Sequence, residues 1–197
     1  MTPEVLILAA GSASRMRGGD KLVEPIAGEA LLRRVARRAL ATGRPVTVAL
    51  APDRPARLAA LDGLALSRVI VPDPGQGMAA SLIAGLAMLP ATAPVLLVLA
   101  DLPELTTEDL QACLAVWADD PQAIPRGADQ NGRPGHPVGF PPDLRVELMA
   151  LSGDEGARAI LARHPARLRL VRLPGAHATT DLDTPEDWAR WRAAQTD

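Results

Sequence analysis

A glycine-rich segment near the N-terminus combines residue types that suit anion binding. Gly11 lets the backbone approach an anion closely, and successive N–H groups with the hydroxyls of Ser12 and Ser14 form a phosphate cradle. Arg15 and Lys21 add positive charge. The spacing fits neither the P-loop nor the dinucleotide-binding fingerprint. We therefore predict a phosphate-binding loop of another kind; the alternative is a glycine-rich connection with incidental charges.

An apolar run at residues 95–100 ends in the carboxylate of Asp101. The charge of an aspartate at the end of a buried strand is costly to desolvate unless it is paired or bound to a cation. Mg²⁺ binds one or two carboxylates and completes its shell with water and substrate phosphates. The sequence therefore predicts Mg²⁺ at Asp101, with a turn-forming or helix-capping aspartate as the alternative.

Two further carboxylates, Asp181 and Asp183, stand two positions apart near the C-terminus. On an extended segment their side chains share a face, so that both can complete a metal site. Thr184 and Pro185 follow directly, and the same stretch is a good N-terminal cap for a closing helix. Metal binding and capping are therefore both open for Asp183.

A second glycine-rich connection, at residues 72–77, enters a helix. The free N–H groups of a helix N-terminus suit an anion or the edge of a base. Gly77 and Ser81 are the expected contacts. A plain helix cap would use the same residues.

The elements that must position these residues alternate between strands and helices. Uninterrupted Val, Leu and Ile strands are typical of a parallel sheet covered on both faces. Such sheets bind ligands at the carboxyl ends of their strands, where the first loop falls. Residues 125–135 are turn-rich and predict a long loop or hairpin. We expect strands at residues 5–10, 46–50, 68–71, 95–100 and 168–173, and helices at 30–41, 54–61, 78–89, 107–117, 154–163 and 185–194.

Composition narrows the classes of function. We expect one domain over residues 1–197, with 21 basic and 23 acidic residues and a net charge of −2. Near-neutral charge, with three tryptophans and one phenylalanine, gives no support for nucleic-acid binding. One cysteine excludes a disulfide framework within the chain, and no apolar run approaches the roughly 20 residues that cross a bilayer. Without a leader-like N-terminus, we expect a cytoplasmic protein that binds no membrane.

The first loop resembles the L-A-A-G-x-S-x-R-M-G-x-x-K signature of the MobA-like NTP transferases, although Arg17 and Gly18 follow Met16 where the family has glycine directly. The A-D-L-P, G-M-A-A-S-L and D-L-D-T-P-E-D segments resemble family motifs as well. The resemblance implies a three-layer, Rossmann-like α/β nucleotidyltransferase fold with a mostly parallel central sheet. It implies nucleotide contacts from Leu8, Ala9, Ala10, Gly11, Ser12, Ser14, Arg15, Lys21, Gly77 and Ser81, metal ligation by Asp101, Asp183 and, less directly, Asp181, and a catalytic set of Arg15, Lys21 and Asp101.

Two more segments resemble the molybdenum cofactor cytidylyltransferase branch of this family, namely G-R-P-G-H-P-V at residues 132–138 and G-D-E-G-A-R at residues 153–158. In that branch they flank the acceptor, which implies acceptor contacts from His136, Asp154 and Arg158. A structural histidine and a helix-capping aspartate are the plainer alternatives. Ala10 stands where the guanylyltransferases have glycine, so the resemblance favours CTP over GTP.

The resemblance implies Mg²⁺-dependent transfer of CMP from CTP to molybdopterin or molybdenum cofactor, with release of pyrophosphate. A recipient molybdoenzyme or its chaperone is a further implied partner. Guanylyl transfer to the same cofactor, or nucleotidyl transfer to a sugar or alcohol phosphate, are alternatives within the class. Two alternatives come from other classes. An NAD(P)-dependent oxidoreductase would require the dinucleotide-binding glycine spacing, which this chain lacks. A non-catalytic nucleotide-binding partner of molybdoenzyme assembly would not need the basic and acidic site residues, which are intact in this chain.

Overall fold

A large β-sheet organises the chain, which the computed structural model describes over residues 2–153 and 156–195. Its strands are β1 (Glu4–Ala9), β4 (Val46–Leu50), β5 (Ser67–Ile70), β6 (Val95–Leu99), β7 (Ile124–Ala128), β8 (Pro134–Phe140) and β9 (Leu168–Arg172). They lie in the order β5-β4-β1-β6-β8-β7-β9. Pairing is parallel between β1, β4, β5 and β6 and between β7 and β9, whereas β8 runs antiparallel to β6 and β7. The predicted mostly parallel sheet is thereby confirmed.

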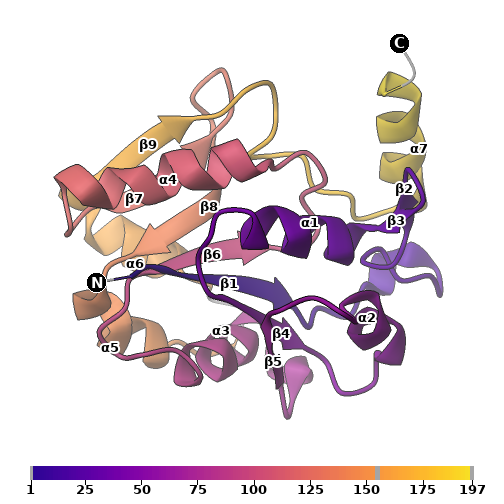
Figure 1. Cartoon of the computed structure of the whole chain (residues 1–197), viewed down its shortest axis with the longest axis horizontal. Coiled ribbons are helices and arrows are strands. Elements are labelled where there is room, and N and C mark those ends of the chain that lie inside the picture. Colours follow the sequence, from indigo (N-terminus) through magenta and orange to yellow (C-terminus); the bar gives the residue numbers. More distant parts are fainter. Residues whose placement is uncertain (1, 154–155, 196–197) are drawn as a thin grey trace.

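Helices cover both faces of this sheet (Figure 1). The helices are α1 (Leu31–Leu40), α2 (Pro55–Ala60), α3 (Met78–Ala87), α4 (Thr107–Asp119), α5 (Arg145–Met149), α6 (Arg158–Arg163) and α7 (Pro185–Ala194). In Figure 1, α1 lies above β1 and α3 and α5 lie below it; the buried clusters place α4 on the face of α1, and α6 on the face of α3 and α5. The result is the expected three-layer α/β architecture.

Side chains along β1 point alternately to the two faces of the sheet and pack into two separate cores. Val5 and Ile7 join one buried cluster, which contains the inward faces of α1 and α4. Leu6 joins the other, which contains residues of α3, α5 and α6. Because neighbouring residues of a strand point to opposite faces, a completely apolar strand is what a sheet covered on both sides requires.

Three local features depart from the sequence-based expectation. A short hairpin of β2 (Pro25–Ile26) and β3 (Glu29–Ala30) precedes α1, and α5 fills a stretch for which we expected no helix. The turn-rich stretch does not depart from expectation, because it forms a hairpin between β7 and β8, one of the two outcomes predicted from the sequence. The helix expected from residue 154 begins at Arg158 and is preceded by a turn, while Asp154 lies outside the described residues.

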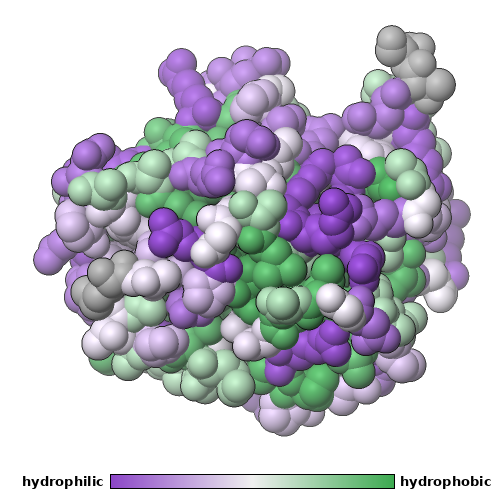
Figure 2. Space-filling view, in the orientation of Figure 1, coloured by the Kyte–Doolittle hydropathy of each residue, from purple (hydrophilic) through white to green (hydrophobic). Residues whose placement is uncertain are grey.

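The surface mixes polar and apolar residues. Figure 2 shows hydrophilic side chains around much of one face and apolar side chains across its middle. The large exposed apolar side chains come from several separate elements, among them Ile70 on β5, Met88 after α3 and Leu170 on β9. Within the described residues, no helix combines the length and the apolar character needed to cross a bilayer.

Gly139 tests the packing that holds β8 in the sheet. A Cβ atom at this position would lie 2.5 Å from Cγ of Pro125 and 2.7 Å from Cζ2 of Trp117, both in rings that cannot yield locally. We expect Gly139→Ala to lower the free energy of unfolding by about 1–3 kcal/mol, measured by chemical denaturation. Gly11→Ala is the control, because its Cβ would meet no atom within 4 Å. An unchanged Gly139→Ala variant would contradict this account of the packing.

Candidate active site

A cleft of about 580 Å³ opens where the carboxyl ends of β1 and β6 meet. Strand ends of a parallel sheet leave backbone groups and loops free for a ligand. Most of the nucleotide and metal residues expected from the sequence line this cleft: Leu8, Ala9, Ala10, Gly11, Ser12, Arg15, Lys21, Gly77, Ser81, Asp101, Asp181 and Asp183.

Three of the expected site residues do not line the cleft. Ser14 is exposed at the start of a single 3₁₀ turn, η1 (Ser14–Met16), and Ala13 before it adopts a left-handed backbone with φ of 53°. His136 and Arg158 lie outside the lining as well. The remaining acceptor candidate, Asp154, lies outside the described residues.

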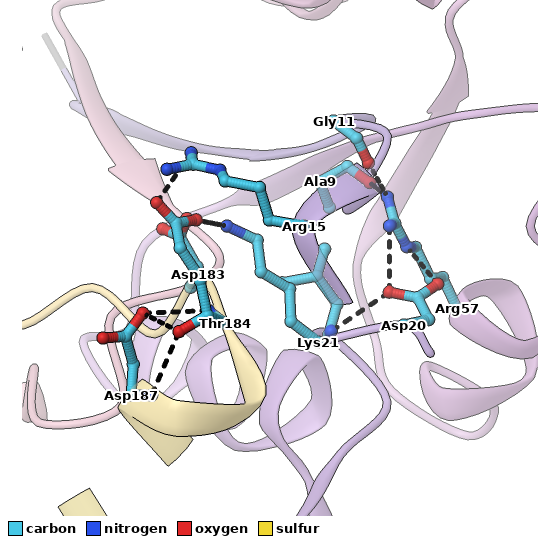
Figure 3. A network of polar contacts seen from close by, with 11 residues as sticks. Ala9, Gly11, Arg15, Asp20, Lys21, Arg57, Asp183, Thr184 and Asp187 are labelled. Atoms are coloured by element: carbon cyan, nitrogen blue, oxygen red, sulfur yellow. Dashed lines mark hydrogen bonds and ion pairs between the residues drawn. The ribbon is translucent and has the colours of Figure 1, made fainter. Parts of the chain in front are cut away.

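An ion-pair cluster forms the floor of the cleft. Nζ of Lys21 lies 2.5 Å from Oδ2 of Asp101 and 2.6 Å from Oδ1 of Asp183. Nη2 of Arg15 lies 2.7 Å from Oδ2 of Asp183, as Figure 3 shows. The structure thus brings together residues that are up to 168 positions apart in the sequence.

Burial and charge act in opposite directions on Lys21. Burial lowers the pKa of its ammonium group, but the carboxylates of Asp101 and Asp183 outweigh that effect and leave the pKa above its ordinary value. Asp181 behaves differently, because burial and the charges of Asp183 and Asp101 all raise the pKa of its carboxyl group. Lys21 is therefore charged at neutral pH, and another cation beside these acids would be stabilised.

The two carboxylates on Lys21 fit a divalent cation. Oδ1 of Asp101 is buried and has no hydrogen-bond partner among the described residues, so one oxygen remains available as a ligand. Within the described part of the chain, no three acidic, histidine or cysteine side chains form a ready-made metal site. Asp101 and Asp183 would thus supply two ligands, and water and substrate oxygens the others, which is the coordination that Mg²⁺ favours.

The cap of α7 leaves Asp183 free for this cluster. Oγ1 of Thr184 accepts a hydrogen bond from the backbone N–H of Asp187, and the Asp187 carboxylate accepts one from the backbone N–H of Thr184. This capping box satisfies the helix start without the side chain of Asp183. The sequence left two roles open for Asp183. Of these, capping of the α7 N-terminus is performed by its neighbour Thr184.

A separate network ties the C-terminal segment to the loop after β6. Oε1 of Glu104 accepts a hydrogen bond from Nε1 of Trp191 at 2.9 Å, and Oε2 accepts one from Oγ1 of Thr180 at 3.0 Å. Trp188 is buried beside Trp191, with the two rings edge to face. Glu104 follows Asp101 by three residues, so these contacts fix the position of the segment that carries Asp183 relative to Asp101.

The second loop presents a helix N-terminus to the cleft. Gly77 is the N-cap of α3, with φ of 90°, a conformation that favours glycine, and no side chain caps the helix. Ser81 is buried one turn further along the helix. The N–H of Ala79 in the first turn donates to the carbonyl oxygen of Gly153 at 3.2 Å. Among the described residues, the other first-turn N–H groups have no side-chain cap, which suits a ligand there.

Beside Asp101, a second cationic region surrounds His136 on β8. Nδ1 of His136 is buried and finds no hydrogen-bond partner in the described ranges, and burial lowers the pKa of its imidazole to about 4. Arg126 on β7 donates from Nε to the carbonyl oxygen of Gly135 at 3.2 Å. Burial lowers the pKa of the Arg126 guanidinium, and the nearby charge of Arg158 lowers it further. Two arginines and a neutral histidine thus lie together.

Three arginines in and around the site, Arg54, Arg57 and Arg126, were not predicted from the sequence. Nη2 of Arg54 donates to the carbonyl oxygen of Ser12 at 3.0 Å, and Arg57 is fully buried beneath the first loop. Arginines are numerous along this chain, and α2 is too short for its buried face to be read from periodicity. Only the antiparallel pairing of β7 with β8 places Arg126 beside His136.

A doubly covered, mostly parallel sheet, with a cation-bearing glycine loop above two carboxylates, is the architecture of a nucleotidyltransferase. Residues 5–168 match the MobA-like NTP transferase domain. The chain belongs to the MobA-like NTP transferase family and is a nucleotidyltransferase, as expected.

Relatives of known name extend over almost the whole chain. A probable molybdenum cofactor guanylyltransferase of Natronomonas pharaonis is 32% identical over 95% of both chains, and a molybdenum cofactor guanylyltransferase of Rhodopseudomonas palustris is 34% identical over 95% of this chain and 89% of its own. A nicotine blue oxidoreductase of Paenarthrobacter nicotinovorans is 28% identical over 94% of both. The crystal structure of Rv0371c from Mycobacterium tuberculosis superposes with a TM-score of 0.83 at 26% identity, covering 97% of this chain and 98% of that one.

Asp101→Asn tests the role of the unpaired carboxylate oxygen. The amide keeps the shape of the side chain but removes its charge, so we expect kcat for nucleotidyl transfer to fall by about 100-fold or more. Thermal unfolding, followed by circular dichroism, should stay close to that of the wild type. Asp62→Asn is the control, because the Asp62 side chain is 72% exposed and remote from the cluster. Unchanged turnover of Asp101→Asn at saturating Mg²⁺ would overturn the assignment.

Proposed function

We propose that this nucleotidyltransferase transfers CMP from CTP to the terminal phosphate of molybdopterin or molybdenum cofactor and releases pyrophosphate. The observation that carries the proposal is the placement of Lys21, Asp101 and Asp183 together beneath the glycine-rich loop. That placement offers cations for a triphosphate and paired carboxylates for Mg²⁺. The two guanylyltransferase relatives support the molybdenum cofactor as the acceptor.

Binding of the triphosphate would replace the ion pairs that the cluster forms within itself. Arg15 and Lys21, now paired with carboxylates, would bind phosphate oxygens, and the carboxylates of Asp101 and Asp183 would hold the metal ion. Mg²⁺ bound there supplies charge neutralisation for the phosphate oxygens. The N–H groups of the first loop and of the α3 N-terminus would orient the nucleotide.

The reaction needs no nucleophile from the protein. An oxygen of the acceptor phosphate attacks the α-phosphorus and forms a new P–O bond. The bond from the α-phosphorus to the bridging oxygen breaks, and that oxygen leaves with pyrophosphate. Alignment of the two phosphates and stabilisation of the charge between them are what the site must provide.

Arg126, Arg158 and His136 are proposed to bind the acceptor. With a pKa of about 4, His136 is neutral at physiological pH and offers a hydrogen bond rather than charge. Arginine forks match phosphate oxygens; Arg126 lies near a histidine that feels the charge of Asp101, and Arg158 lies near Arg126. The acceptor phosphate would therefore lie beside the metal site. Asp154 is kept as a candidate of the same region from the sequence resemblance.

The choice of base rests on Ala10. Ala10 lines the cleft and is buried in the apolar cluster that contains α3. If the base binds against this residue, its methyl group would occupy space that glycine would leave open. A smaller space favours cytosine over the larger guanine. Guanylyl transfer is the second candidate, because two relatives bear that name.

Pyrophosphate release tests the proposed reaction. Purified protein would be incubated with Mg²⁺, molybdenum cofactor and either CTP or GTP, with each component omitted in turn. Cofactor-dependent release that favours CTP is the expected result. Release with GTP alone would replace the base assignment, and release with neither would overturn the proposed acceptor. Oxidation of NAD(P)H, followed in a parallel assay, would instead favour the activity class that the oxidoreductase relative bears in its name.

Charge removal tests the acceptor site separately from the nucleotide site. We expect Arg126→Gln and Arg158→Gln each to raise KM for the acceptor about 10-fold or more, because each removes a charge-assisted hydrogen bond. KM for the nucleotide should change little. Arg133→Gln is the control, since Arg133 is exposed on the turn of the same hairpin. A parallel rise in KM for the nucleotide would contradict a dedicated acceptor site.

A further inference from the structure

Arg57 is a fully buried arginine beneath the first loop. Its side chain has no exposed surface, and every nitrogen of its guanidinium donates a hydrogen bond. Nε and Nη2 bind the two oxygens of Asp20 at 2.7 and 2.9 Å. Nη1 binds the carbonyl oxygens of Ala9 and Gly11 at 2.7 and 2.8 Å, as Figure 3 shows. One side chain therefore holds both ends of the loop.

These contacts determine the direction of the loop peptides. In a planar trans peptide, the C=O and the following N–H point in opposite directions. Because the carbonyl oxygen of Gly11 points to Arg57, the N–H of Ser12 points away from it. Gly11 and Ser12 line the cleft and Arg57 does not, so that this N–H is turned to the side on which a phosphate would lie.

Asp20 carries the same constraint to Lys21. Its Oδ1 accepts hydrogen bonds from Nη2 of Arg57 and from the backbone N–H of Leu22, so the turn on both sides of Lys21 is fixed. The buried pair is neutral as a whole, and the cations of the described lining that remain for an anion are Arg15, Lys21 and Arg54. The pair shapes the loop without competing for the ligand.

We propose that Arg57, together with Asp20, is a positioning residue that holds the phosphate-binding loop in its binding conformation before the nucleotide arrives. This inference rests on the proposed function. Lysine cannot replace arginine here, because a single ammonium nitrogen cannot span a carboxylate and two separate carbonyl oxygens as the guanidinium fork does.

Isothermal titration calorimetry on the intact protein tests the proposal, with CTP, GTP and inorganic tripolyphosphate as probes in the presence of Mg²⁺. Tripolyphosphate has no base, so it reports on the loop whatever the base preference. We expect Arg57→Lys to weaken binding of tripolyphosphate and of the preferred nucleotide by about 10- to 100-fold. Asp20→Asn, which leaves the carbonyl contacts of Arg57 in place, should weaken both by a smaller factor.

Arg145→Lys is the matched control. Arg145 also donates to backbone carbonyl oxygens, those of Leu86, Leu89 and Pro90, but at the end of α3 remote from the cleft. We expect this variant to lower the melting temperature and to keep wild-type affinity for all three probes. A merely structural role of Arg57 would produce the same result as in Arg145→Lys, with a lower melting temperature and unchanged affinity.

The outcomes separate the two proposals. If the wild type binds tripolyphosphate and folded Arg57→Lys binds it within threefold of the wild type, the positioning role is overturned while the proposed function stands. If Arg57→Lys does not fold, Asp20→Asn decides, because unchanged affinity in that variant overturns the role of the pair. If the wild type binds none of the probes, the proposed function fails and the inference fails with it.

Discussion

The ammonium group of Lys21 lies between two carboxylates that reach it from distant parts of the chain. Asp101 and Asp183 repel each other and lose water in the cleft, so neither position is favourable without a cation between them. Lys21 follows the first strand, Asp101 follows β6 and Asp183 precedes α7. The rest of the structure must hold these three segments in fixed positions relative to one another. The hydrogen bonds from Thr180 and Trp191 to Glu104 help to do so.

The same cluster explains how a strongly charged ligand can enter a half-buried site. Arg15, Lys21, Asp101 and Asp183 balance one another in charge, so no uncompensated charge is buried before binding. Under the proposed function, triphosphate oxygens take over the cations while a metal ion takes over the acids. Binding is then an exchange of ion pairs in which each charged side chain keeps a partner of opposite sign, and the desolvation penalty of an isolated charge is avoided.

The sequence predicts best what depends on neighbouring residues. The apolar strands, the glycine-rich loop, Asp101 at a strand end and the capping box at Thr184 are local patterns, and the structure contains each of them. Which face of a six-residue helix is buried depends on tertiary packing, and so Arg57 could not be identified beforehand. The outward position of Ser14 likewise follows from the left-handed backbone at Ala13, which no pattern announces. The single domain over residues 1–197, the cytoplasmic location and the handover to a molybdoenzyme or its chaperone stay predictions.

The proposed contribution of Ala10 to the choice between cytosine and guanine is limited in size. One methyl group in an apolar pocket changes discrimination between substrates by about 1–3 kcal/mol, which corresponds to roughly 10- to 200-fold. Stronger discrimination requires polar groups that would be left unpaired by the wrong base. The backbone of the loop at Gly75 and Gly77 and the carboxylate of Asp53 also line the cleft and offer such groups. Under the proposed function, a methyl group and a few hydrogen bonds at one end of the cleft would suffice to change the preferred base, which is compatible with the guanylyltransferase name of two relatives.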